Sequence, residues 1–284
     1  MINKKKIQVL MITGLTTAEH RPYINERIRT LLESTRRFSV KLTEEFRGAS
    51  DEMLESYDLV FVNYNGKALI TDPAIRWGEK AEKALFDFVK NGKGIIVYHS
   101  SLFVDDPDWP DEYKKLLGMY LCMEEGGRRN PKGDFVVHLD TKEHPITKGI
   151  NESWMVINDD LFAGTSIHKD ANIEVLASVF DNVENYRVPY FPSKHQPTVV
   201  IPEGKLENMP GVNKMQPVIW TNRYGKGRVF AVSIGHEMET IGRVEFVALF
   251  CRGAEWAATG EVTIDPPDRS GDNRLIPWPY YTNK

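Results

Sequence analysis

Three of the seven histidines follow apolar segments whose composition is that of buried strands. His20 lies shortly after the apolar run 7–13, His99 directly follows 94–98, and His236 follows 228–233. In an open α/β sheet, ligands bind outside the carboxyl ends of the strands, so we expect the three imidazoles to share one pocket. Histidine is the most frequent general acid or base and a common metal ligand. The structural alternative is that each histidine only caps its strand.

Carboxylates stand where they could complete such a site. Asp159 and Asp160 follow an apolar pair, and Glu237 directly follows His236. A carboxylate can orient a histidine, bind sugar hydroxyls or hold a metal ion, although an Asp-Asp pair is also common at a turn or a helix N-cap. Two chemistries remain open. One is acid–base catalysis by the set His20, His99, Asp159 and His236. The other is a site for Zn²⁺ or a similar divalent ion, held by His20, His99 and His236.

The first hundred residues predict the sheet that would position these groups. Continuous apolar strands alternate with segments that have helical spacing, which is typical of a doubly wound, mostly parallel α/β sheet of the flavodoxin-like kind. The expected strands are 7–13, 39–43, 58–62 and 94–98, and the expected helices are 22–36, 51–56 and 76–90.

The second half predicts additional antiparallel strands. Short strands are expected at 135–139, 173–180, 198–201, 218–221 and 228–233, with a hairpin over 223–229 and a last helix over 241–258. We expect one domain, residues 1–260. The Pro-rich segment 261–284 is expected to be an irregular tail packed on that domain.

Composition excludes several classes of protein. The net charge of the 284-residue chain is −4, so it lacks the basic excess of a nucleic-acid-binding protein. Its two cysteines, Cys122 and Cys251, have no zinc-type spacing, and no apolar run reaches the roughly 20 residues of a membrane span. We expect a cytoplasmic protein, or a periplasmic one if a leader has been removed, whose partner is a small molecule. Self-association into a homo-oligomer is left open.

Four motifs together resemble the ThuA-like (trehalose utilisation) family, whose fold is that of the class I glutamine amidotransferases. They are GKGIIVYHSS, HPITKGI, NDDLF and PVIWTNRYGKGRVFAVSIGHE, and they occur in the family's order. Two departures are visible. The family's acidic pair is more often Asp-Glu before Leu-Tyr, whereas this chain has Asp159-Asp160 before Leu161-Phe162. The family's final Gly-His is often followed by Asp, whereas this chain has Glu237.

The resemblance implies a sugar-active protein in the catabolism of trehalose, related disaccharides or keto-sugars, with a histidine base. Class I amidotransferases place a cysteine nucleophile at the turn that here reads His99-Ser100-Ser101, so glutamine hydrolysis through a thiol is not expected. The alternatives are a metal-dependent hydrolase or isomerase and a non-catalytic carbohydrate-binding protein. No other cofactor is expected. Candidate sugar-binding residues are Tyr64, Asn65, Tyr98, Ser100, Trp109, Asp160, Tyr186, Arg187 and Glu237.

Overall fold

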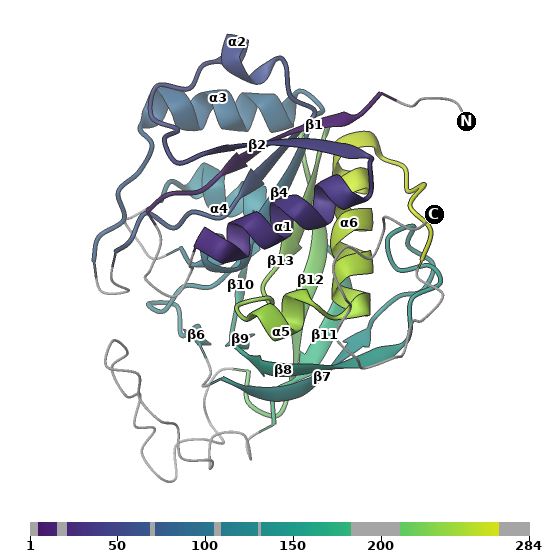
Figure 1. Ribbon diagram of the computed structural model, residues 1–284. Coiled ribbons are helices and arrows are strands. Elements are labelled where there is room, and N and C mark those ends of the chain that lie inside the picture. The colour runs from purple at the N-terminus through teal and green to yellow at the C-terminus, as the bar shows by residue number, and fades with distance from the viewer. Residues whose placement is uncertain are drawn as a thin grey trace.

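The computed structural model describes residues 5–15, 22–68, 72–104, 109–129, 132–182 and 211–266. Within them, one nine-stranded sheet runs through the molecule in the order β2-β1-β3-β4-β13-β12-β11-β7-β8 (Figure 1). The first five strands in this order run parallel to one another. They are β2 (Phe38–Thr43), β1 (Ile7–Ile12), β3 (Leu59–Val62), β4 (Gly94–Tyr98) and β13 (Gly227–Val232).

The antiparallel strands of the second half extend this same sheet. Each pairs antiparallel with its neighbour: β12 (Met215–Tyr224), β11 (Glu174–Phe180), β7 (Gly133–Leu139) and β8 (Ser153–Asp159). Two short antiparallel pairs lie apart from it, β5 (Met119–Tyr120) with β10 (Ser166–Ile167), and β6 (Arg128–Arg129) with β9 (Phe162–Ala163). The predicted mostly parallel sheet with added antiparallel strands is therefore confirmed.

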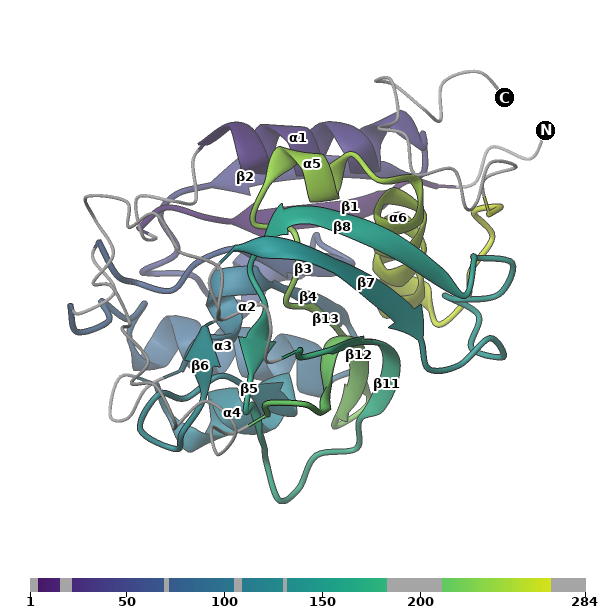
Figure 2. The same cartoon turned by 90° about the horizontal axis from the view of Figure 1, so that it is seen from below.

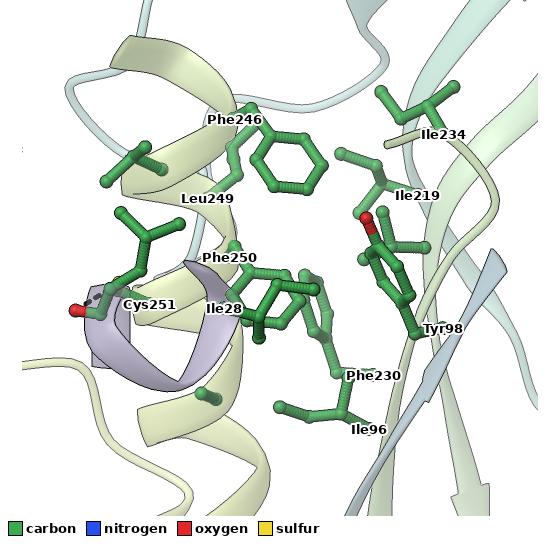
Figure 3. Close-up of a cluster of buried hydrophobic side chains, with 14 of the residues drawn as sticks. Ile28, Ile96, Tyr98, Ile219, Phe230, Ile234, Phe246, Leu249, Phe250 and Cys251 are labelled. Atoms are coloured by element: carbon green, nitrogen blue, oxygen red, sulfur yellow. Dashed lines mark hydrogen bonds between the residues drawn. The ribbon is translucent and has the colours of Figure 1, made fainter. Parts of the chain in front are cut away.

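Helices cover both faces of the parallel half, which explains why its central strands are apolar along their whole length. On one face lie α1 (Pro22–Ser34), α5 (Met238–Ile241) and α6 (Val244–Thr259) (Figure 1). On the other lie α2 (Asp51–Leu54), α3 (Glu79–Lys90) and α4 (Asp111–Leu117). Each face has its own apolar core. The rings of Tyr98, Phe230 and Phe246 gather around Phe250 on the α6 side (Figure 3).

The antiparallel half curls back over the molecule. Strand β8 is an edge strand, separated from β13 by β12, β11 and β7 in the sheet order. Nevertheless it packs against α5 (Figure 2). Its side chains Trp154 and Val156 join the core on the α6 side. The curl brings the end of β8 to the carboxyl ends of β4 and β13, where the histidines lie.

Most predicted elements occur within one to three residues of their expected bounds, and β4 matches in full. The sequence pattern does not predict α4 or β8. The expected strand 198–201 lies outside the described residues. At the start of the expected tail, Val262 and Ile264 pack against the core. Among the helices of the described ranges, none has the length and apolar character needed to cross a membrane.

Candidate functional site

His99 stands at the point where strand β4 gives way to the 3-10 helix η1 (His99–Leu102). Its φ of +43° is unusual for a residue other than glycine, and such conformations cluster at functional sites. The turn separates two neighbouring side chains. Tyr98 enters the core (Figure 3), and its hydroxyl donates to the carbonyl oxygen of Gly235. His99 instead stacks on Phe162, with ring centroids 4.9 Å apart, and its Nδ1 lies 2.5 Å from the carbonyl oxygen of Ser233.

His236 follows the parallel strand β13, three residues further from its strand end than His99 is from the end of β4. The preceding Gly235 has φ +105°, and a Cβ there would lie 2.3 Å from the Tyr98 hydroxyl, so only glycine fits. The Nδ1 of His236 lies 3.0 Å from Glu237 Oε1. Hydrogen bonds from His236 and Lys132 lower the pKa of Glu237 to about 2, against the effect of burial, so Glu237 is a carboxylate that accepts from both.

The two aspartates at the end of β8 have different partners. Asp159 accepts from three main-chain N–H groups: Gly235 at 2.7 Å, His236 at 2.9 Å and Asp160 at 2.8 Å. It is fully buried, and burial raises its pKa to about 6. Both its oxygens are therefore committed to holding the turn that carries His236. The side chain that meets the histidines is that of Asp160.

His99, Asp160 and His236 form a compact buried centre. Asp160 Oδ2 lies 3.9 Å from His99 Nε2 and 3.8 Å from His236 Nε2, and the two imidazole centroids are 5.2 Å apart. The exposed fractions of the three residues are only 1%, 1% and 4%. Among the residues that the structure describes, this is the single group of three or more histidine, cysteine or acidic side chains whose ligand atoms all lie within 4.8 Å of one another.

The other predicted residues lie in different surroundings. Ser100 is buried at the start of η1. Tyr64 donates through its hydroxyl to Ile75, and its ring and that of Trp109 pack in an aromatic cluster around Trp77. Asn65 accepts from the N–H of Lys67. His20, Tyr186 and Arg187 lie outside the described residues, so the proposed roles of these three stay predictions.

Three groups that contact the centre or its neighbour Glu237 are not among the predicted site residues. They are Phe162, which stacks on His99, the carbonyl oxygen of Ser233, and Lys132, which pairs with Glu237. Phe162 follows the acidic pair so closely that its proximity could have been anticipated. The contact of Lys132 spans 105 residues of sequence, and no local pattern signals it.

Comparisons with known proteins agree with the fold and the motifs. The chain matches the ThuA (trehalose utilisation) family model over residues 8–257. A ThuA-like protein from Parabacteroides merdae ATCC 43184 has a TM-score of 0.71 and 22% identity, with 93% of this chain and 94% of that chain covered. A ThuA-like protein from Bacteroides uniformis ATCC 8492 has a TM-score of 0.63 and 18% identity, with 92% of this chain and 94% of that chain covered.

A cytoplasmic protein from Salmonella typhimurium LT2 has a TM-score of 0.54 and 13% identity, with 88% of this chain and 99% of that chain covered. At these identities the solved structures show the fold alone. No curated protein matches the chain. The family match covers most of the chain, from the first strand to the last helix, and on that ground the chain belongs to the ThuA, or trehalose utilisation, family.

Proposed function

We propose that this protein acts on a sugar, in the breakdown of trehalose or of a related disaccharide or keto-sugar. The reaction is centred on His99, Asp160 and His236. The observation that carries the proposal is their convergence, because three separate segments of the chain bring two imidazoles and a carboxylate into one buried cluster. The family description supplies the substrate class. Buried polar groups that gather at the carboxyl ends of parallel strands are typical of active sites in this kind of sheet.

The chemistry proposed is proton transfer at a carbon next to a sugar carbonyl, or at a glycosidic oxygen. A carbonyl or a carboxylate oxygen can only accept a hydrogen bond. In a neutral histidine Nδ1 therefore donates, from His99 to the carbonyl oxygen of Ser233 and from His236 to Glu237 Oε1. The lone pair of each ring is then on Nε2, the atom that faces Asp160. An imidazole that accepts a proton there becomes an imidazolium beside a carboxylate, which stabilises the charge.

Glutamine hydrolysis is not part of the proposed function. Both cysteines are buried, and Cys251 lies in α6, with its thiol 3.9 Å from the carbonyl oxygen of Leu31 (Figure 3). Burial raises the pKa of the Cys251 thiol far above its usual range, which disfavours the thiolate that attacks amides. In place of a nucleophile, the turn after β4 carries His99.

A second candidate is a metal-dependent hydrolase or isomerase at the same centre. One observation favours it: the distances of 3.8 and 3.9 Å between Asp160 and the two Nε2 atoms are longer than hydrogen bonds. An acid–base dyad would bring a histidine and its orienting carboxylate to about 2.6–3.2 Å.

The test is a screen of trehalose, other disaccharides and their keto derivatives, first by thermal shift and then by turnover of every compound that binds. We expect at least one keto-sugar or disaccharide to be both bound and converted. His99→Ala should lower turnover by about 10²-fold or more, whereas the exposed His138→Ala should not change it. Binding without turnover would identify a carbohydrate-binding protein instead. Failure of the whole set to bind would overturn the proposal.

A further inference from the structure

We propose that His99, Asp160 and His236 are the protein ligands of one divalent transition-metal ion, for which Zn²⁺ is the best-matched probe. The binding of the ion is independent of any sugar. Its assignment to catalysis rests on the proposed function: the ion would polarise a sugar carbonyl or hydroxyl at the same centre. This polarisation would take the place of proton transfer to Nε2, because a coordinated Nε2 has no lone pair left to accept a proton.

The spacing of the donor atoms fits a shared cation. Zinc bonds to histidine nitrogen and carboxylate oxygen are about 2.1 Å long, so two atoms that share an ion are at most about 4.2 Å apart. The separations of Asp160 Oδ2 from His99 Nε2 and His236 Nε2, at 3.9 and 3.8 Å, fall below this limit and above hydrogen-bond length. Each of the three residues offers one ligand atom, and these atoms all lie within 4.8 Å of one another.

The far side of each imidazole is arranged as in known metal sites. A ligating histidine usually donates its other N–H to a backbone carbonyl or a carboxylate, which fixes the tautomer and the ring orientation. His99 does so to the Ser233 carbonyl at 2.5 Å, and His236 to Glu237 at 3.0 Å. Glu237 is held in turn by Lys132. Both Nε2 lone pairs consequently face Asp160, as coordination requires.

The donor set also selects the class of ion. Two imidazoles and one carboxylate suit Zn²⁺, Fe²⁺ or Mn²⁺, whereas Ca²⁺ and Mg²⁺ prefer sites made only of oxygen ligands. The centre is almost entirely buried, and the ring of Phe162 lies against one side of it. A dicationic ion offsets the buried charge of Asp160. Three protein ligands leave at least one coordination position for a substrate oxygen or water.

Elemental analysis of the full-length protein, purified without a metal-affinity column, is the direct test. We expect about one transition-metal ion per chain, or uptake of about one Zn²⁺ after dialysis against a chelator. Zn²⁺ at 100 times its Kd should stabilise the metal-depleted protein by about 2.7 kcal/mol, measured as a rise in Tm, and the same concentration of Mg²⁺ should not. Absence of both uptake and stabilisation would overturn the proposal.

Variants locate the ion. His99→Ala, His236→Ala and Asp160→Asn should each abolish uptake, whereas the buried His168→Ala and the exposed His138→Ala should retain it. If a ligand variant does not fold, Glu237→Gln replaces it. That change keeps the shape of the side chain, removes the carboxylate behind His236, and should weaken Zn²⁺ binding by about 10- to 100-fold. Unchanged binding in Glu237→Gln and in every folded ligand variant would place the ion elsewhere and refute the assignment.

The metal measurements and the sugar screen can fail separately. A protein that binds Zn²⁺ at these residues but converts no sugar would overturn the proposed function and leave the metal site standing. A protein that converts a sugar at full rate after complete metal removal would retain the function and eliminate the ion from it.

Discussion

The carboxylate of Asp159 holds the main chain of His236: its Oδ1 accepts the His236 N–H at 2.9 Å, and its Oδ2 accepts that of Gly235 at 2.7 Å. An edge strand of the sheet thus fixes the turn that follows a central strand. Both oxygens of Asp159 are engaged by main-chain N–H groups, so we infer that Asp159 positions the imidazole of His236.

Asp159→Asn tests this positioning role. The amide would present an N–H to at least one of the N–H donors that Asp159 now accepts, leaving a buried donor unpaired. We expect the free energy of unfolding to fall by about 1–3 kcal/mol. We also expect metal affinity to fall by about 10-fold or more. Urea denaturation and Zn²⁺ titration measure the two effects, and the exposed Asp170→Asn is the matched control. Unchanged Zn²⁺ affinity in folded Asp159→Asn would contradict the positioning role.

The two cysteines should be dispensable for activity. In a Cys122→Ser, Cys251→Ala double variant we expect full turnover per folded molecule, because both thiols are buried in apolar cores and neither belongs to the group formed by His99, Asp160 and His236. Stability should fall by about 1–3 kcal/mol, since both changes are made in packed cores. Turnover after treatment of the native protein with a thiol reagent provides the second measurement. Selective inactivation without unfolding would show that a thiol takes part.

Arg252 should be a major contributor to stability. Its guanidinium donates to four carbonyl oxygens, those of Pro145, Ile146, Lys148 and Ile264, and so ties the HPITKGI turn and the segment after α6 to that helix. Arg252→Lys keeps the charge but cannot reach all four oxygens, so we expect a loss of roughly 2–4 kcal/mol in urea denaturation. Arg29→Lys, at an exposed ion pair on α1, should change stability by less than about 0.5 kcal/mol. Equal losses of stability in Arg252→Lys and Arg29→Lys would refute the proposed role of the four hydrogen bonds from Arg252.

His144 should make the fold less stable in mild acid. Burial lowers its pKa, the positive charge of Arg223 lowers it further, and Glu174 opposes both. Its ring packs on Trp256, and its Nδ1 accepts from the N–H of Ile146, as a neutral imidazole does. The unfolded chain therefore binds a proton more readily than the folded one. As pH falls below the unfolded value of about 6.5, the free energy of unfolding should fall, until the folded pKa is passed.

The measurement is urea denaturation at about pH 7.5 and about pH 5.5 for the native protein and for His144→Asn. The variant keeps an acceptor for the Ile146 N–H but cannot titrate in this range. Its loss of stability on acidification should be smaller than that of the native protein. An identical loss in both proteins would assign the pH dependence to other groups.

The sequence predicted the parallel half of the fold closely because its strands are buried on both faces, so that apolar runs such as 58–62 and 94–98 stand out. It also predicted that His99 and His236 converge, since both follow parallel strands that are neighbours in the sheet. It did not predict β8. That strand pairs and curls through contacts distant in sequence, and the choice between Asp159 and Asp160 depends on them. Local patterns also do not distinguish Tyr64 and Trp109, which pack on Trp77, from aromatic residues that face a ligand.

Because of the curl of the sheet, the site depends on the local stability of an edge strand. His99 and His236 follow strands in the middle of the sheet, but Asp160 follows β8, which has a strand neighbour on only one side. Edge elements open at lower free energy than central ones. A molecule in which β8 detaches would keep its parallel half and both histidines, yet it would lose the carboxylate and the clamp on the His236 turn together. We therefore expect any ligand of the centre to slow hydrogen exchange in the edge strand β8 more than in β3 or β4, which lie inside the sheet.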